Sequence, residues 1–179
     1  MSGFNINEIK SHLTFGGARQ NLFQVSITNP TDRASTLVTP FFVQSASIPA
    51  ADVGTIEVPY FGRKLKLAGD RTFPAWTVNV INDEDFLIRN AMEQWSNRIN
   101  GLESNIRTIG GEYKSEATVT QYSKGGSALR TYGFHNLFPT DISPIELDWG
   151  TNDQYETFQV TFQYDYWTVT GGVTGTPGT

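Results

Sequence analysis

The segment from residue 157 to residue 167, TFQVTFQYDYW, alternates strictly between large apolar and polar side chains. One face carries Phe158, Val160, Phe162, Tyr164 and Tyr166, and the other carries Gln159, Thr161, Gln163 and Asp165. A period of two is the pattern of a half-buried β-strand, with one set of side chains in a core and the other at a surface. Most of the polar side chains are amides and hydroxyls. Because soluble monomers usually protect strand edges with charges, this composition favours edges that pair with another copy.

The same alternation predicts further strands along the chain. They are expected at residues 21–28, 75–81, 115–122 and 128–134, with shorter candidates at 41–46, 63–67 and 145–149. Residues 31–36 read as a polar loop, and residues 68–71 read as a turn. Together these predicted strands indicate a mainly β, antiparallel protein, which we expect to be a sandwich or barrel with one flanking helix.

One substantial helix is predicted over residues 83–99. Ile88, Ala91, Met92, Trp95 and Ile99 recur at spacings of three and four, which is the core-facing stripe of an amphipathic helix. Asn82 or Asp83 is the expected N-terminal cap, because short polar side chains accept hydrogen bonds from the first backbone amides.

The length of 179 residues suits a single domain, which we expect to span residues 1–169. A short N-terminal helix is predicted at about residues 5–14, where apolar residues have helical spacing. Residues 47–61 contain two prolines, Pro49 and Pro59, and no clean period, so they are expected to form an extended arm. The final residues, 170–179, read as a flexible tail of glycine and threonine.

Composition excludes several classes of function. The chain has no cysteine, which rules out disulfides, thiolate nucleophiles and cysteine metal sites. A net charge of −5 and an isoelectric point near 5.0 argue against a generic nucleic-acid binder. No apolar run approaches the length of a membrane-spanning helix, and no secretion signal opens the chain. These features predict a soluble, acidic protein made inside the cell.

The residues that could carry chemistry are sparse. His135 is the more plausible of two histidines as an acid–base group, but no nucleophile motif accompanies it. The pairs Asp83 with Asp85 and Asp148 with Asp153 are better explained by capping and turns than by metal binding. We therefore predict no enzyme activity and no catalytic, cofactor-binding or metal-ligating residue. A hydrolase built on His135 and a monomeric binding module remain the alternatives to a structural protein.

Several blocks together carry a family resemblance. They are GRKLKLAGDRTFPAWTVNVINDEDFLIRNAMEQW at 62–95, QNLFQVSI at 20–27, SIPA at 47–50, EYKSEATVTQY at 112–122, LFPTDISPIELDW at 137–149 and TFQVTFQYDYW at 157–167. In this order they resemble the tail tube proteins of contractile-tailed bacteriophages. The chain departs from that pattern by a longer loop at 30–36 and by the tail that follows Trp167.

The resemblance implies an assembly in the virion tail, built in the host bacterial cytoplasm. Tube proteins form hexameric rings that stack into a hollow tube with a continuous inner β-barrel, inside a contractile sheath. The implied partners are other copies of the chain, the tail sheath protein, a baseplate tube-initiator, the tape-measure protein in the lumen, and DNA in transit without specific binding. No direct membrane insertion is implied. The alternative is a tube-initiator or other baseplate ring, or a tube protein of a related contractile injection system, a group that includes the haemolysin-coregulated protein of type VI secretion.

Two sets of residues are expected to serve such an assembly. The candidates for contacts between subunits or rings lie in the arm and just after it: Ile48, Val53, Ile56, Val58, Arg63, Lys64, Asp70 and Arg71. The candidates for the lumen wall are uncharged polar residues of alternating strands: Thr118, Thr120, Gln159, Thr161 and Gln163. The first set would cover apolar surface on a neighbour, and the second would form a wetted wall with few binding points.

Overall fold

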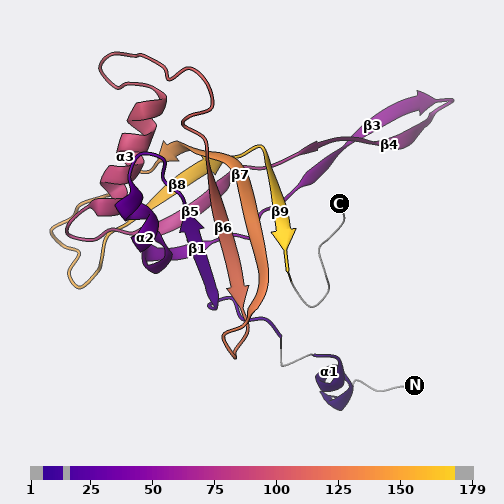
Figure 1. The fold of residues 1–179 in the computed structure, drawn as a ribbon. Helices are drawn as coiled ribbons and strands as arrows, with labels where there is room; N and C mark the ends of the chain where they lie inside the picture. The colour runs from indigo at the N-terminus through magenta and orange to yellow at the C-terminus, as the bar shows by residue number, and fades with distance from the viewer. Residues whose placement is uncertain (1–5, 14–16, 172–179) are drawn as a thin grey trace.

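The computed structural model describes residues 6–13 and 17–171 (Figure 1). The helices are α1 (Ile6–His12), α2 (Arg33–Phe42) and α3 (Leu87–Ile99). The strands are β1 (Phe23–Ile27), β2 (Val43–Ala46), β3 (Asp52–Tyr60), β4 (Arg63–Thr72), β5 (Trp76–Ile81), β6 (Ser115–Tyr122), β7 (Ala128–Ile142), β8 (Thr157–Gln163) and β9 (Tyr166–Thr170). The expected mainly β, antiparallel class is confirmed, whereas most of the predicted tail at 170–179 lies outside the described residues.

Seven strands form one antiparallel sheet along the path β1-β6-β7-β8-β5-β2, with β9 paired to β7. The long strand β7 pairs with β6 and β9 through its first half and with β8 through its second half. We call β1, β6, β9 and the first half of β7 the first layer. The second layer consists of β2, β5, β8 and the second half of β7. The two layers enclose the core (Figure 1), and the strands at the ends of the path, β1 and β2, approach each other at a seam.

Strand β7 passes from one layer to the other at Asn136, whose φ is 58°. Asparagine is one of the few residues that adopt this left-handed conformation readily. The ladder with β6 shifts register at the same point, as at a β-bulge. The side-chain amide of Asn136 donates to Asp165 Oδ2 over 2.7 Å, and the backbone amide of Asp165 donates to the His135 carbonyl over 3.1 Å. The turn between β8 and β9 is therefore tied to the bend that joins the layers.

Aromatic side chains from both layers and from α3 meet in the core. Trp76 stacks on Phe134 with ring centroids 4.3 Å apart, and Trp95 of α3 lies 6.1 Å from Phe162. The inward faces predicted from alternation and from the helical stripe are confirmed by burial, at Trp76, Val78, Val80, Ala117, Val119, Phe158, Val160 and Phe162 in strands and at Ile88, Ala91, Met92 and Trp95 in α3. Burial of these apolar surfaces is the main source of stability for a fold of this kind.

The predicted start and cap of the long helix are wrong. Helix α3 begins at Leu87 instead of residue 83, and its N-cap position is Phe86, with φ 53° and no side-chain cap. Asp83 is in a preceding turn, where its carbonyl accepts from the Phe86 amide over 2.9 Å. The carboxylate that reaches the helix is that of Asp85, which accepts from the Leu87 amide over 3.0 Å.

A second helix replaces the polar loop predicted at 31–36 and part of the strand predicted at 41–46. Asp32 caps α2, because its carboxylate accepts from the amides of Ala34 and Ser35 over 3.0 and 3.1 Å. Threonine, serine and Pro40 have weak helical propensity, which obscured the helix in the sequence, yet α2 continues through Pro40. Buried Thr39 satisfies its hydroxyl within the helix by donating to the Ser35 carbonyl over 2.6 Å.

Other predicted boundaries are also corrected. The strand candidate at 63–67 and the turn at 68–71 are together the single strand β4, whose partner β3 lies in the predicted arm. The strand at 128–134 continues to Ile142, and the strand at 157–167 divides into β8 and β9. Residues 145–149 form no strand.

Asp32→Ala should destabilise the subunit by about 1 kcal/mol, because it removes the cap that holds two amides of α2. The free energy of unfolding in urea measures this effect. Asp83→Ala is the matched control, since the predicted cap at that position is absent, and it should change stability by less than half as much. Equal losses in the two variants would contradict the assignment.

Candidate assembly surfaces

His135 is part of a surface network of polar and aromatic side chains. Its ring stacks on Tyr166 with centroids 4.7 Å apart, Nε2 lies 2.9 Å from Thr168 Oγ1, and Nδ1 lies 3.6 Å from Glu116 Oε1. These partners orient the ring between β6, β7 and β9. These contacts give His135 a structural role in joining the three strands.

The acidic residues considered as metal ligands serve turns. Asp148 Oδ1 accepts from the Gly150 amide over 2.9 Å, as expected for an Asx turn. Among the described residues, no three acidic or histidine side chains gather closely enough to hold a metal ion. Within the same residues, no helix is long and apolar enough to cross a membrane.

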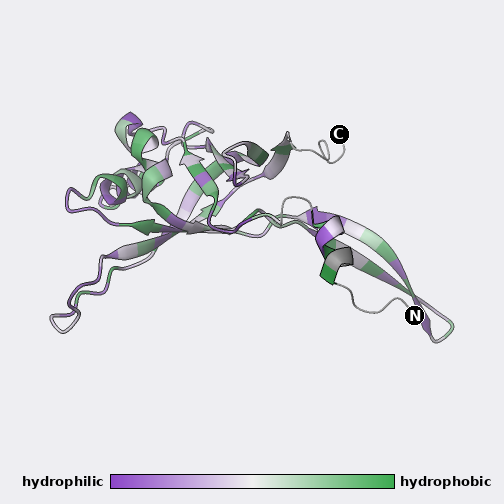
Figure 2. Cartoon of the chain, turned by 90° about the horizontal axis from the view of Figure 1, so that it is seen from below, coloured by the Kyte–Doolittle hydropathy of each residue, from purple (hydrophilic) through white to green (hydrophobic). Residues whose placement is uncertain are grey.

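Strands β3 and β4 form a hairpin that projects away from the two layers (Figures 1 and 2). Paired residues of an antiparallel ladder share a face, so the pairs Ile56 with Leu67 and Val58 with Leu65 lie on one side. Their exposed fractions are 54% for Ile56 and 58% for Leu65, although both are apolar. The hairpin therefore presents an apolar face to solvent, and we call it the apolar face of the arm.

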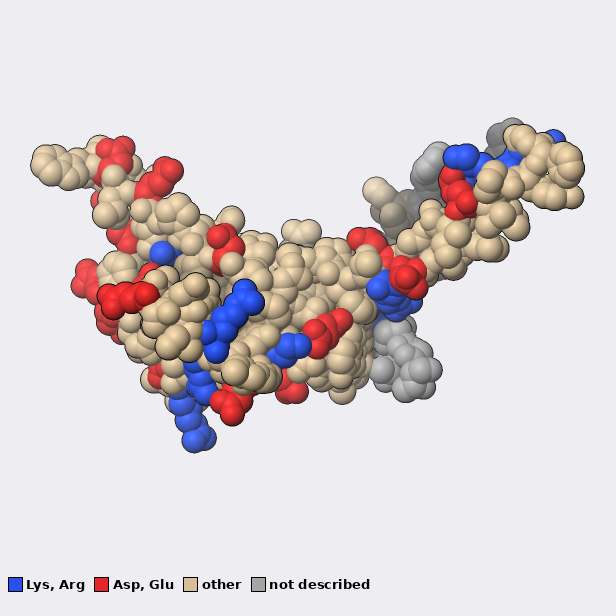
Figure 3. Space-filling model, turned by 90° about the horizontal axis from the view of Figure 1, so that it is seen from above, with Lys and Arg blue, Asp and Glu red and all other residues tan. Residues whose placement is uncertain are grey.

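The opposite side of the arm is charged. Glu57 pairs across the ladder with Lys66, and Lys64 Nζ lies 2.6 Å from Glu57 Oε2. Figure 3 shows acidic and basic side chains together towards the end of the arm. Of the other predicted contact residues, Arg63 stands at the turn opposite Tyr60, whereas Asp70 and Arg71 are near the base.

The base of the arm is anchored to the core by indole groups. Trp76 Nε1 donates to the Ser47 carbonyl over 2.8 Å, and Trp167 Nε1 donates to the Ala50 carbonyl over 3.1 Å. These bonds hold the SIPA segment that leads into β3. The arm thus leaves the body from a fixed base, while the side chains of its apolar face stay exposed among the described residues.

Only the β3 half of the apolar face of the arm was predicted from the sequence. The prediction selected Val53, Ile56 and Val58 on β3 but missed Leu65 and Leu67 on β4. The signal was present as the alternation of Lys64 and Lys66 with the two leucines, which is a strand pattern with one apolar face. The predicted Ile48 is not on the arm, since it lines a groove between β1 and β2.

The five predicted lumen residues are not brought together. Thr118 and Thr120 lie on the outward face of the first layer, where Thr120 Oγ1 is 3.1 Å from Thr131 Oγ1. Gln159, Thr161 and Gln163 lie on the outward face of the second layer, where Thr161 Oγ1 is 3.4 Å from Thr77 Oγ1. Because the layers face each other across the core, the two sets point to different sides of the subunit.

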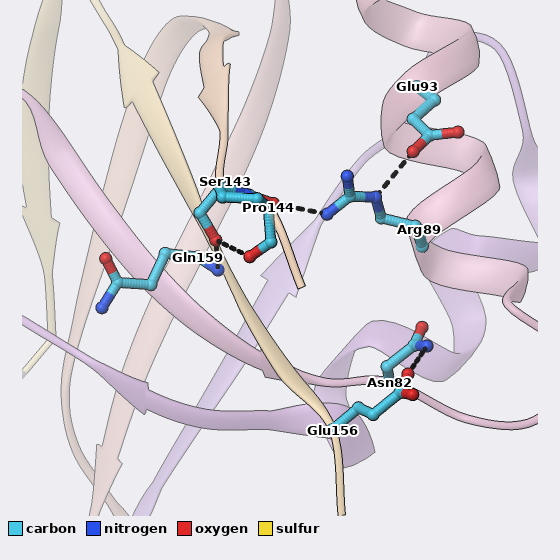
Figure 4. A network of polar contacts seen from close by, with 7 residues as sticks. All are labelled: Asn82, Arg89, Glu93, Ser143, Pro144, Glu156 and Gln159. Atoms are coloured by element: carbon cyan, nitrogen blue, oxygen red, sulfur yellow. Dashed lines mark hydrogen bonds and ion pairs between the residues drawn. The ribbon is translucent and has the colours of Figure 1, made fainter. Parts of the chain in front are cut away.

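A polar network fixes α3 and the loop after β7 on the second layer (Figure 4). Arg89 donates to the Ser143 carbonyl and to Glu93 Oε1, each over 2.6 Å, and its guanidinium lies 5.1 Å from the centre of the Phe158 ring. Ser143 Oγ in turn accepts from the Gln159 amide over 2.8 Å. Figure 4 shows the Gln159 side chain pointing away from Arg89 and α3.

The first layer has a free edge on each side. Within the described residues, the outer edges of β1 and β9 pair with no other strand. In the second layer, the outer edge of β2 and the edge of residues 138–142 of β7 opposite β8 are likewise unpaired. Strands β1 and β9 contain no proline and no charged residue that would protect their edges. Such edges are templates for pairing with another chain.

Several solved structures of contractile injection systems contain chains with this fold. A chain in the tube terminating cap of the anti-feeding prophage has a TM-score of 0.64 at 21% identity, over 86% of this chain and 91% of that one. A chain in the extended sheath–tube complex of the PVC extracellular contractile injection system has a TM-score of 0.57 at 18% identity, over 94% and 99%. These similarities define the class of fold, that of contractile injection system components.

Sequence comparison identifies the family. The family described as phage tail tube protein matches residues 18–170. The tail tube protein gp19 of Enterobacteria phage T4 is 36% identical over 154 residues, which cover 84% of this chain and 90% of gp19. The tail tube protein of Serratia phage KSP90 is 29% identical over 168 residues, covering 89% and 93%. The chain belongs to the phage tail tube protein family, and it is a structural, non-enzymatic tail tube protein of a contractile phage tail, homologous to gp19.

The contacts of Asp165 with Lys114 and Asn136 hold the turn that leads into β9, and their contribution to stability should depend on pH. Hydrogen bonds from Lys114 and then Asn136 hold the pKa of Asp165 below its ordinary value of 3.8. A carboxyl group whose pKa falls on folding stabilises the protein above its unfolded-state pKa, and this contribution is lost as the pH falls through the folded-state pKa. Because Asp165 is 47% exposed, the ion pair contributes less than about 1 kcal/mol.

We therefore expect Asp165→Asn to lower the free energy of unfolding slightly at neutral pH and progressively less below the ordinary carboxyl pKa. Urea unfolding at several pH values measures this difference. Asp153→Asn, in the loop before β8, should show no such trend. An Asp165→Asn effect that stays constant as the pH falls would contradict the charge argument.

Proposed function

We propose that the chain forms hexameric rings, and that these rings stack into a hollow tube that conducts the phage genome inside a contractile sheath. The observation that carries this proposal is the exposed apolar face of the arm. Membership of the tail tube family supports the same assembly, since a tube requires many copies of one subunit.

The arm is the proposed contact between subunits. An isolated two-stranded hairpin is at best marginally stable in water, and this one exposes Ile56, Val58, Leu65 and Leu67 on one side. A neighbouring copy that covers this face would bury it and stabilise the hairpin at the same time. On the other side, Glu57, Lys64 and Lys66 suit contact with water or with polar groups at an interface.

The first layer is the proposed wall of the lumen. Its edges at β1 and β9 are both free, so this layer can be continued in two directions by other copies, and its outward face carries uncharged hydroxyl groups at Thr118, Thr120 and Thr131. Closing six such layers would give a continuous inner barrel without edges. This assignment keeps Thr118 and Thr120 as lumen residues. It moves Gln159, Thr161 and Gln163 to the side of the subunit away from the lumen.

A wall of this kind suits passage of DNA without binding. Threonine hydroxyls on the first layer are polar and uncharged, so they offer water contacts but no fixed cation for phosphate. Proteins bind DNA largely because their cationic side chains displace counterions from the phosphates. A subunit with a net charge of −5 instead repels the phosphates, which opposes such binding. The tape-measure protein is the proposed occupant of the lumen before ejection.

The remaining proposed partners are the tail sheath protein on the outside and a baseplate tube-initiator at one end, in a virion tail assembled in the host bacterial cytoplasm.

The second candidate function is that of a baseplate ring, or of a tube protein of a related injection machine. A chain in the baseplate structure of the anti-feeding prophage, with a TM-score of 0.66 at 14% identity over 87% of this chain, favours this candidate by its fold.

Replacing Ile56 and Val58 together by aspartate should leave the subunit folded and prevent tube growth, because charged groups cannot be buried in the contact. Circular dichroism checks the fold, and negative-stain electron microscopy with light scattering over a concentration series checks assembly. The control variant Glu57→Gln with Lys66→Gln changes the charged side of the same hairpin and should assemble within about threefold of the unaltered concentration. Normal tubes from the aspartate variant would overturn the role of the arm.

A further inference from the structure

The tip of the arm has a residue that its own turn does not favour. Tyr60 pairs with Arg63, so Phe61 and Gly62 are the two central residues of the turn, with φ of 43° and 77°. Positive φ at both positions marks a type I′ turn, which prefers asparagine before glycine. A bulky aromatic residue in the left-handed region is an outlier that the local backbone does not explain.

Solvent exposure makes the choice of Phe61 more unusual. Its exposed fraction is 91%, and that of Tyr60 is 71%, with the two rings edge to face and their centroids 4.7 Å apart. Neither ring packs against the body of the subunit, from which the tip is far removed (Figure 1). An exposed aromatic pair at the end of a projecting arm has the character of an anchor for a partner, because aromatic side chains dominate the energetics of interfaces.

The same chain offers a groove of matching chemistry. At the seam between β1 and β2 lies a groove of about 650 Å³, with an apolar floor of Phe23, Ala46, Val119 and Tyr132 and with Ile48 at its side. Val119 and Tyr132 point to the core, so the seam is a place where the two layers leave the core open. The rim is polar and includes Asn21.

Two other hollows in the described residues are less suited to an aromatic pair. The hollow beside α3 is lined by Asp85, Arg89 and Glu93, and the hollow beside the loop before β8 is lined mainly by polar residues. Burying rings against charged groups would cost the solvation of those groups. The groove at the seam has the apolar floor that Tyr60 and Phe61 would need.

We infer that the arm of one copy inserts Tyr60 and Phe61 into the β1–β2 groove of a second copy. The nine residues of β3 span about 30 Å, which is enough to reach across a neighbouring subunit. Tip and groove are different surfaces, so the contact is head-to-tail, and each copy donates one tip and receives one. Repeated contacts of this type generate rings or helices. The inference rests on the proposed tube assembly and names the receiving surface for its arm.

Paired cysteines test the contact directly, because the chain has no cysteine of its own. Arg63→Cys combined with Asn21→Cys places one thiol at the tip, beside the intact Tyr60 and Phe61, and one at the groove rim. Mild oxidation during assembly should give a ladder of covalent oligomers on denaturing gels, since a disulfide forms only between closely placed residues. Arg63→Cys alone, and Arg63→Cys with Gln94→Cys on the exposed side of α3, should give dimers at most.

A second pair of variants separates turn strain from anchoring. Phe61→Asn supplies the residue that the turn prefers, so the subunit should be as stable as the unaltered chain or more stable, while the concentration needed for assembly rises at least tenfold. Phe61→Tyr keeps an aromatic ring and should assemble within about twofold of the unaltered chain.

Several results would overturn the inference. Rings or tubes that form while the Arg63–Asn21 cysteine pair cross-links no better than its controls would exclude the groove and leave the proposed function intact. Cross-linking of Ile9→Cys, on α1, to Asn21→Cys in place of the tip would assign the groove to the N-terminal helix. Unimpaired assembly of Phe61→Asn would show that the aromatic tip is not an anchor. If the unaltered chain forms neither rings nor tubes at any concentration, the failure lies with the proposed function.

Discussion

An isolated two-stranded hairpin has no second layer against which to bury an apolar face, and the β3–β4 arm has such a face along its length. Its base is fixed to the core by Trp76 and Trp167, so the arm cannot fold back without breaking those hydrogen bonds. Ile56 and Leu67 must therefore stay in water or be covered by another copy. The subunit is thus built as an incomplete unit, and assembly supplies the missing layer.

The bend of β7 gives the subunit its two outward faces. At Asn136 one strand leaves the first layer and enters the second, and the contacts of Asp165 hold that bend in place. As a result, each layer keeps two free edges, and the second layer also carries α3 and its polar network. A ring built by pairing the free edges of the first layer would place the threonine-rich face on the inside.

Elements dominated by local periodicity could be predicted from the sequence. The alternation around Val160 and the helical stripe around Trp95 both placed the buried faces correctly. Helix α2 was missed because Pro40 and a run of hydroxyl residues have weak helical propensity, which the Asp32 cap and tertiary packing override. The lumen candidates were divided between two layers, since alternation tells which side of a strand is polar but not which layer the strand joins. That information depends on the bend at Asn136, where one residue decides the pairing of strands far apart in sequence.

Hydrogen–deuterium exchange of the arm tests the central claim most directly. The amides of residues 52–72 should exchange quickly in the isolated subunit, because a hairpin without a second layer opens readily, and should become strongly protected in assembled tubes or isolated tails. The strands of the core provide the internal standard, since their exchange should be slow in both states. An arm that exchanges equally in the subunit and in the tube would contradict the account.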